Sequence, residues 1–579
     1  MVISFECDVT YKIWLFPIEK VFSQKKYELM NLSHYISLLE RNDPIINLLN
    51  VIGIKIPNEL AERLIDVLKN NFFIKKIVLQ SNDLEKHYVD RFFQLLLLNP
   101  SIAHLEINNN SVDDESLEFL KNVLVQLSPS REKINLVLRG NNFGFKGATY
   151  LADILNANVP IKCLDIRDNN QITDKGIEEI CLSLRSNTNL TILDIISCGC
   201  GVLGMTALSD ALISNNTLQT LMIQDEMNFS TIYSLCQILS YEFCSLQTLY
   251  LWHCQLTTED VKGLCSSLKK NNSLNTLALS FNKIDDSGAY CICDMLHKNT
   301  TITKLHIGAN LFTPTSAGFF GVAISNNKVL RTFDISRNFI TSNGVWPIAV
   351  ALCNTSTLSV LDLRYNKINS SSGEILAEML HNNKSLTILR LSGNNLGDTT
   401  ISLLSKTFPH NKTLAEIELN NVNMTTNGFI EICKALKNNK TLLRISLNQN
   451  LFSSGSLEHL KNLLQENTTL QFIGISDCDI YSSGCRFIGQ GIELNNSLHA
   501  IDISKNQIDS EGLKYILDAL IGNYSLEVMH MIENPFISQN ESKKMIMDIT
   551  NCLERNKYYL HNSLMKDMAG LASDPVLFE

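Results

Sequence analysis

The 579-residue sequence contains little proline, glycine or charge. Its 11 Pro and 26 Gly exclude collagen-like and Pro-rich architectures. At roughly 150 residues per domain, the length predicts about four domains. So little Pro and Gly leaves scant material for linkers between four domains, and this mismatch is the first clue to how the chain is organised.

No apolar run approaches the roughly 18 residues that a membrane-spanning helix requires. Glu6 and Asp8 precede any apolar segment, so the N-terminal stretch does not resemble an ordinary secretory signal. The net charge of −10 is opposite in sign to the basic face of most nucleic-acid binders. The sequence therefore predicts no membrane span and no nucleic-acid partner.

The 16 cysteines are spread along the chain rather than concentrated in a short segment. Dense cysteine in a short chain is typical of disulfide scaffolds, whereas scattered cysteine is typical of reduced proteins. We therefore expect free thiols and a cytoplasmic location.

A repeated frame accounts for most of the sequence. Residues 274–284 read LNTLALSFNKI, and the same L-x-x-L-x-L-x-x-N frame begins again at Ile302, Leu330, Leu358 and Leu386. Counted by the last apolar residue of its L-x-L core, the frame occurs in 18 units, and 15 of the 17 intervals between units are 28 residues. Such regularity indicates one solenoid rather than four domains.

Each unit contains two periodicities. The L-x-L part alternates as a strand does, while the second half has helical spacing, as in Leu513, Ile516, Leu517 and Leu520. An Asn-rich turn such as 382–386 ends each helix and generates repeated N-x-S/T triplets, which we interpret as structural rather than as glycosylation sites. Stacked units predict an α/β solenoid, a curved horseshoe with a parallel β ladder on its concave face and helices on its convex face.

An asparagine follows the strand in 12 of the units, and Cys198, Cys254 and Cys478 take its position in three more. We expect its amide to bond backbone groups at the inward turn. In the remaining units, a buried Glu226 would be costly, so we expect an irregular turn over 224–229.

The repeat also divides the chain. We predict an N-terminal cap over residues 1–44, the solenoid over residues 45–540 and a helical C-terminal cap or tail over residues 541–579. Caps are expected because the apolar faces of the terminal units would otherwise be exposed to water.

The 28-residue unit with its long helix resembles the ribonuclease-inhibitor-like leucine-rich repeat over residues 45–540. That resemblance implies a non-enzymatic scaffold that binds a partner protein on its concave face. No G-x-x-x-x-G-K-[ST] motif is present, unlike in immune receptors of this family, and no acidic run closes the chain, unlike in the activators of the Ran GTPase. The repeats resemble those of repeat-only effectors of intracellular bacterial pathogens, which implies a host-protein partner and the host cytoplasm. The alternative is a regulator of a small GTPase.

Strand alternation identifies the side chains of the concave face and its rim. Tyr250 and Trp252 share one strand, and large aromatics are typical of interfaces unless a loop covers them. A mixed-charge patch follows, whose alternative interpretation is a solvated face with weak ion pairs. The predicted partner-binding residues are Tyr250, Trp252, His253, Phe281, His306, Asp334, Arg337, Asp362, Arg364, Tyr365 and Arg390.

A hydrolase site is a third hypothesis, because His306 is expected beside Asp334, with Ser280 and Ser336 near. Strand neighbours about 4.8 Å apart produce many such pairs by chance, and an open ladder offers no oxyanion hole. Metal binding at Cys198 and Cys200 is disfavoured because Cys198 occupies the asparagine position, and at Cys291 and Cys293 because residues two apart in a helix diverge. We therefore expect no catalytic residue, no cofactor and no metal.

Overall fold

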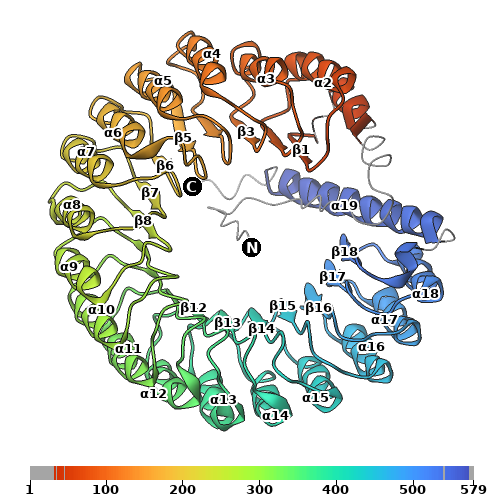
Figure 1. Ribbon diagram of the computed structural model, residues 1–579. Helices are drawn as coiled ribbons and strands as arrows, with labels where there is room; N and C mark the ends of the chain where they lie inside the picture. Colours follow the sequence, from red (N-terminus) through yellow and green to blue (C-terminus); the bar gives the residue numbers. More distant parts are fainter. Residues whose placement is uncertain (1–31, 34, 43, 45, 539–541, 573–579) are drawn as a thin grey trace.

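The computed structural model describes residues 32–33, 35–42, 44, 46–538 and 542–572 of the chain. The predicted units form a solenoid whose strands line the inside and whose helices cover the outside (Figure 1). The arc is so long that, in the view of Figure 1, the first and last units face each other across helix α19 (Ser542–Ala572). This confirms the predicted α/β leucine-rich-repeat solenoid.

In the described residues, 18 strands form one parallel sheet, and each strand pairs with the next one along the chain. We number the units by their strands. The strands are β1 Leu48–Ile52, β2 Lys76–Gln80, β3 His104–Asn108, β4 Ile134–Val137, β5 Ile161–Asp165, β6 Ile192–Asp194, β7 Thr220–Ile223, β8 Thr248–Leu251, β9 Thr276–Ala278, β10 Lys304–His306, β11 Thr332–Asp334, β12 Val360–Asp362, β13 Ile388–Arg390, β14 Glu416–Glu418, β15 Arg444–Ser446, β16 Phe472–Gly474, β17 Ala500–Asp502 and β18 Val528–His530.

A helix follows each strand. The α-helices are α2 Asn58–Asn70, α3 Lys86–Leu98, α4 Asp114–Leu124, α5 Phe145–Asn156, α6 Thr173–Ser183, α7 Val202–Leu212, α8 Phe229–Ser240, α9 Thr258–Leu268, α10 Asp286–Lys298, α11 Pro314–Asn326, α12 Thr341–Cys353, α13 Gly373–Asn382, α14 Gly397–Thr407, α15 Thr426–Leu436, α16 Leu457–Glu466, α17 Ser482–Leu494, α18 Ser510–Gly522 and α19. Short 3-10 helices are η1 Ser370–Ser372, η2 Ser454–Ser456 and η3 Pro535–Ser538.

The asparagine after each strand has the predicted mechanical role. Asn310 donates from Nδ2 to the Leu279 carbonyl of the preceding unit and to the Ile307 carbonyl of its own unit, both at 3.0 Å. Its Oδ1 accepts from the Ile284 N–H at 3.2 Å. Cys198 replaces this asparagine with a thiol that donates to the Ile166 carbonyl at 3.1 Å. The 15 cysteines in the described residues are all free.

A second buried asparagine follows most of the helices, and it explains the N-x-S/T triplets. Asn467 donates to the Leu436 and Asn439 carbonyls of the preceding unit, and its Oδ1 accepts from the N–H groups of Thr469 and Leu470. The Thr469 hydroxyl donates to the same Asn439 carbonyl at 3.2 Å. Both residues of the triplet are therefore occupied in joining one unit to the next, which supports the structural interpretation over glycosylation.

The turn over 224–229 is irregular, as predicted. Glu226 is exposed rather than buried in the asparagine position. Asp225, just before it, accepts from the Gly199 N–H of the preceding unit at 3.1 Å. The buried-charge cost is thus avoided because the turn directs Glu226 into solvent.

The last unit is closed by a helix that imitates the next unit. Arg555 of α19 donates from Nη2 to the carbonyls of Leu520 and Asn523, the two carbonyls that the asparagine of a further unit would bond. Asn556, fully buried, donates to the Leu526 carbonyl at 2.7 Å. This supports the proposed C-terminal cap. Most of the predicted N-terminal cap (1–44) lies outside the described residues.

We expect Arg555→Ala to lower the free energy of unfolding of the last unit by about 1–3 kcal/mol, because buried carbonyls lose charged donors. Hydrogen exchange of α18 measures this loss directly. Lys544→Ala, at an exposed position near the start of the same helix, is the matched control. Equal exchange rates in α18 for the two variants would contradict the proposed capping role.

Candidate functional site

The parallel register places equivalent residues of successive units in rows on the concave face. The last residue of each three-residue strand from β10 to β14 pairs with the last residue of the next strand, in the order His306, Asp334, Asp362, Arg390 and Glu418. Because the spacing of parallel strands is about 4.8 Å, neighbouring side chains in this row contact one another. The predicted charged residues are therefore brought together.

We define the central charge network as His306, Asp334, Asp362, Arg364, Arg390, Glu416, Glu418 and Arg444. Arg364 donates from Nε to both carboxylate oxygens of Asp362, at 3.0 and 2.9 Å, and lies 3.5 Å from Glu418. Arg390 donates from Nε to Glu418 at 2.8 Å and from Nη2 to Glu416 at 3.2 Å. Glu416 also lies 3.6 Å from Arg444. These ion pairs thus link four successive strands, β12 to β15, and the His306–Asp334 pair lies on the two strands before them.

Burial distinguishes this network from a solvated face. The Asp362 side chain is only 3% exposed, and Glu416 and Glu418 are 21% and 20% exposed. Burial raises the pKa of Asp362, assisted by the charge of Asp334 and opposed by Arg364. Burial also acts to raise the pKa of Asp334, but hydrogen bonds with His306 and Ser336 outweigh it and hold that pKa below its usual range.

The aromatic residues predicted from the sequence lie beside this network. Tyr250 and Trp252 are half-buried on the concave side of β8, and their rings form an edge-to-face pair with centroids 5.0 Å apart. His253 stacks on Phe281 at 4.5 Å, and the Arg337 guanidinium lies 4.3 Å from the ring centre of Tyr365. The rim residues therefore lie in two contacting pairs from adjacent units.

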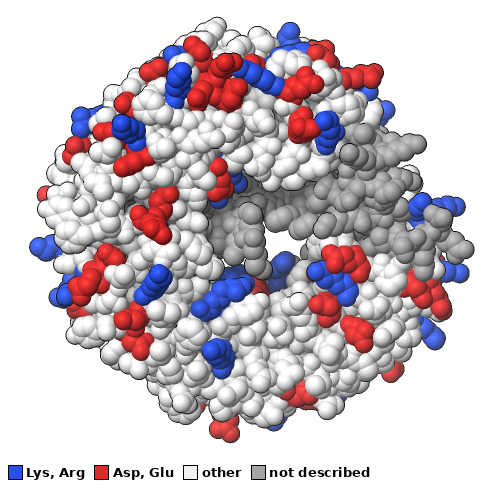
Figure 2. Space-filling view, viewed as in Figure 1, with Lys and Arg blue, Asp and Glu red and all other residues white. Residues whose placement is uncertain are grey.

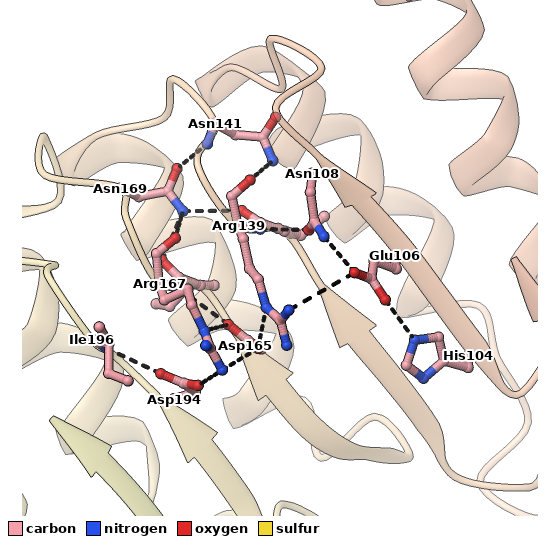
Figure 3. Close-up of polar contacts among 12 residues, drawn as sticks. His104, Glu106, Asn108, Arg139, Asn141, Asp165, Arg167, Asn169, Asp194 and Ile196 are labelled. Atoms are coloured by element: carbon pink, nitrogen blue, oxygen red, sulfur yellow. Dashed lines mark hydrogen bonds and ion pairs between the residues drawn. The ribbon is translucent and has the colours of Figure 1, made fainter. Parts of the chain in front are cut away.

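Another charge network lies earlier in the chain, in units 3 to 6, and its residues were not among those predicted. Figure 3 shows Arg139 and Arg167 extending between carboxylates of neighbouring strands. Arg139 donates from Nε to Asp165 at 2.6 Å, and Arg167 pairs with both Asp165 and Asp194. Glu106 lies 3.3 Å from His104 and 3.9 Å from Arg139. We call these six residues the first charge network.

The first charge network is the more deeply buried of the two. The side chains of Asp165 and Asp194 are 5% and 2% exposed. Burial, and then the charge of Asp165, raise the pKa of Asp194 to about 7 despite Arg167. Burial lowers the pKa of His104. The same strand alternation that identified Asp334 and Asp362 identifies Glu106, Asp165 and Asp194, so the sequence contained the signal.

The geometry gives little support to the hydrolase hypothesis. His306 Nδ1 lies 3.5 Å from Asp334 Oδ2, so the pair exists. Asp334 also accepts from the backbone N–H of Ser336, and the Ser336 side chain is buried. Among the described residues, no cluster of three or more His, Cys, Asp and Glu side chains has the geometry to hold a metal ion.

Comparison with known proteins agrees with the fold. Models described as "Leucine Rich repeat" match residues 157–181, 270–293, 382–405 and 494–517, and another leucine-rich-repeat model matches residues 245–267. The chain contains leucine-rich repeats and folds as a leucine-rich-repeat solenoid, and part of it is similar to ribonuclease inhibitor. Leucine-rich-repeat scaffolds typically mediate protein–protein interaction and are generally non-enzymatic.

The particular relatives match over part of their length. Ribonuclease inhibitor of Mus musculus is 29% identical over 191 residues, which are 33% of this chain and 41% of that protein. NACHT, LRR and PYD domains-containing protein 14 of Mus musculus is 28% identical over 206 residues, which are 35% of this chain and 20% of that protein. A chain in the solved structure "Crystal structure of Rad7 and Elc1 complex in yeast" aligns with 79% of this chain and 90% of its own length. The aligned residues are 13% identical, and the TM-score is 0.34. No helix in the described residues is long and apolar enough to cross a membrane.

Proposed function

We propose that this chain is a non-enzymatic scaffold that binds a partner protein on the concave face of units 8 to 14. The observation that carries the proposal is the central charge network, a row of partly buried, mutually oriented charges that begins two strands beyond the half-buried pair Tyr250 and Trp252. Oriented charges provide specificity for a partner, and aromatic side chains provide affinity. The proposed contact residues are the eleven predicted from the sequence.

We expect Tyr250→Ala combined with Trp252→Ala to reduce partner capture by at least about 30-fold, because interface aromatics commonly contribute 2 kcal/mol or more. Pull-down with quantified bound partner measures the effect, and circular dichroism checks that the solenoid remains folded. Phe229→Ala with Tyr233→Ala is the matched control, because those stacked rings are exposed on the outer helix α8. Equal capture by both double variants would remove Tyr250 and Trp252 from the proposed interface.

A role as an effector in a host cytoplasm, and the alternative of small-GTPase regulation, rest on the family resemblance. A GTPase regulator that donates an arginine needs that side chain available, yet Arg364 and Arg390 are both held by carboxylates. The ion pairs therefore favour the scaffold. If the chain stimulates GTP hydrolysis by any member of a panel of small GTPases, the regulator becomes the favoured function. If it stimulates none, the regulator hypothesis is eliminated.

A further inference from the structure

Over units 8 to 13, one edge of the solenoid carries cations and exposed rings but no carboxylate. We define the edge strip as the residues directly before and after the strand-end Asn or Cys of units 8 to 13: His253, Gln255, Phe281, Lys283, Ala309, Leu311, Arg337, Phe339, Tyr365, Lys367, Gly393 and Asn395. The strip has three cations and no Asp or Glu, in a chain of net charge −10. Figure 2 shows that elsewhere many charges lie in small groups where both signs meet.

The strip also exposes more apolar surface than scattered surface residues do. Phe281, Leu311, Phe339 and Tyr365 are 36%, 46%, 42% and 41% exposed, and they come from four consecutive units. Contiguous exposed apolar side chains mark interaction surfaces. Among the described residues, no carboxylate pairs with Lys283, Arg337 or Lys367, so their charges are available to a partner.

The side chains of the strip are already ordered. Arg337 lies on the face of Tyr365, and the Lys367 ammonium lies 4.6 Å from the ring centre of Phe339. Tyr365 in turn lies against Gly393, where an added Cβ would come within 2.2 Å of the ring. Ordering before binding reduces the entropy that a partner must overcome.

The backbone shows that these large side chains are held in an unfavourable conformation. Phe281, Arg337 and Tyr365 have φ of 60°, 55° and 55°, in the left-handed region that Gly and Asn adopt most readily. The equivalent position has the same left-handed backbone in most units, where it holds residues as different as Gly140, Asn421 and Lys505. The repeat turn therefore imposes this conformation, and in the strip it fixes the direction in which Phe281, Arg337 and Tyr365 leave the backbone.

We propose that the edge strip binds an acidic, aromatic- or leucine-containing segment of a partner protein. This rests on the proposed function and names the chemistry of the partner. Carboxylates would pair with Arg337 and Lys367, and apolar side chains would pack on the exposed rings. An open hollow lined by Tyr365, Lys367, Asn369, Gly393 and Asn395 gives room for one such side chain. A second hollow, lined in part by Arg337, Arg364 and Glu418, connects the strip to the central charge network.

Charge excludes the other candidate partners. Nucleic acid binding depends on many phosphate contacts, and anionic membranes are bound by clusters of about four to eight cations. The strip has three cations, fewer than either of these partners requires. An acidic polypeptide segment needs fewer cations and uses the rings.

The test uses a fluorescent synthetic peptide in which Asp and Glu alternate with Phe and Leu, measured by anisotropy with the full chain. We expect saturable binding that weakens about tenfold or more in Arg337→Glu with Lys367→Glu. Lys406→Glu with Lys412→Glu, exposed cations outside the strip, should bind as the wild type does. Phe281→Asn with Tyr365→Asn should also weaken binding without lowering the melting temperature, because Asn tolerates the left-handed backbone.

Three results would overturn the proposal: no binding of the acidic peptide, equal binding of a peptide with Lys in place of Asp and Glu, or no effect of the Arg337 and Lys367 reversal. Preferential binding of a single-stranded oligonucleotide or of phosphatidylserine vesicles would also overturn it. The outcome that would overturn the proposed function is a different one, because it depends on Tyr250 and Trp252. A captured partner that survives the charge reversal but is lost with Tyr250→Ala and Trp252→Ala leaves the scaffold intact and removes the edge strip.

Discussion

Replacing Asn439 by Ala is expected to lower the free energy of unfolding by about 3–4 kcal/mol. Asn439 is buried in the turn after α15, where Nδ2 donates to the Phe408 carbonyl at 2.7 Å. Its Oδ1 accepts from the N–H groups of Thr441 and Leu442 at 2.9 and 2.7 Å. Alanine would leave three buried backbone groups without a partner, and each such group costs about 1–3 kcal/mol.

The neighbouring residue provides the matched control. Asn438 is exposed, and Asn438→Ala is expected to change stability by less than about 0.5 kcal/mol. Urea unfolding measures the difference, and hydrogen exchange at the Thr441 and Leu442 amides locates it. Because each unit of a solenoid is stabilised mainly by its neighbours, exchange should rise in units 14 and 15 first. If the two variants unfold indistinguishably, the buried asparagines after the helices do not join one unit to the next.

This asparagine shows how far the sequence determines the fold. The 28-residue period fixed the strands, the helices and the rows of the concave face, because stacking in register leaves one arrangement of equivalent positions. The sequence also predicted the strand-end asparagine. It identified the asparagine after the helix only as a turn residue, since its bonds to the preceding unit depend on how closely the units stack.

The candidate site was predictable in position but not in detail. Alternation placed Asp362, Arg364 and Arg390 on one face. It places Glu416, which pairs with Arg390, and Arg444, which pairs with Glu416, on the same face, but neither was among the predicted residues. Pairing directions depend on side-chain rotamers, which periodicity does not specify. Nor does periodicity indicate the outcome of burial: Asp194 and Asp334 occupy equivalent positions, and burial is the largest single influence on the pKa of each. Burial prevails at Asp194, whereas at Asp334 the hydrogen bonds and charge of His306, with the hydrogen bonds of Ser336, together outweigh it.

That difference predicts opposite responses of the two aspartates to pH. The folded-state pKa of Asp194 is about 7, above its value in an unfolded chain of about 4. A raised pKa contributes stability that is complete below pH 4 and is lost as the pH rises through 7. Burial prevails over Arg167 because the Asp194 side chain is 2% exposed, whereas that of Arg167 is 18% exposed. About three pKa units correspond to about 4 kcal/mol.

We therefore expect the free energy of unfolding of the wild type, relative to Asp194→Asn, to fall by about 4 kcal/mol between pH 4 and pH 8. Asparagine stays neutral, so the variant lacks this dependence. Asp334→Asn is the control: the pKa of Asp334 is lowered, so its contribution is constant above about pH 5 and is lost only in acid. Urea unfolding of the three proteins across this range measures both slopes. A flat difference for Asp194→Asn would show that Asp194 is charged when folded, and that the first charge network is a fully ionised set of pairs.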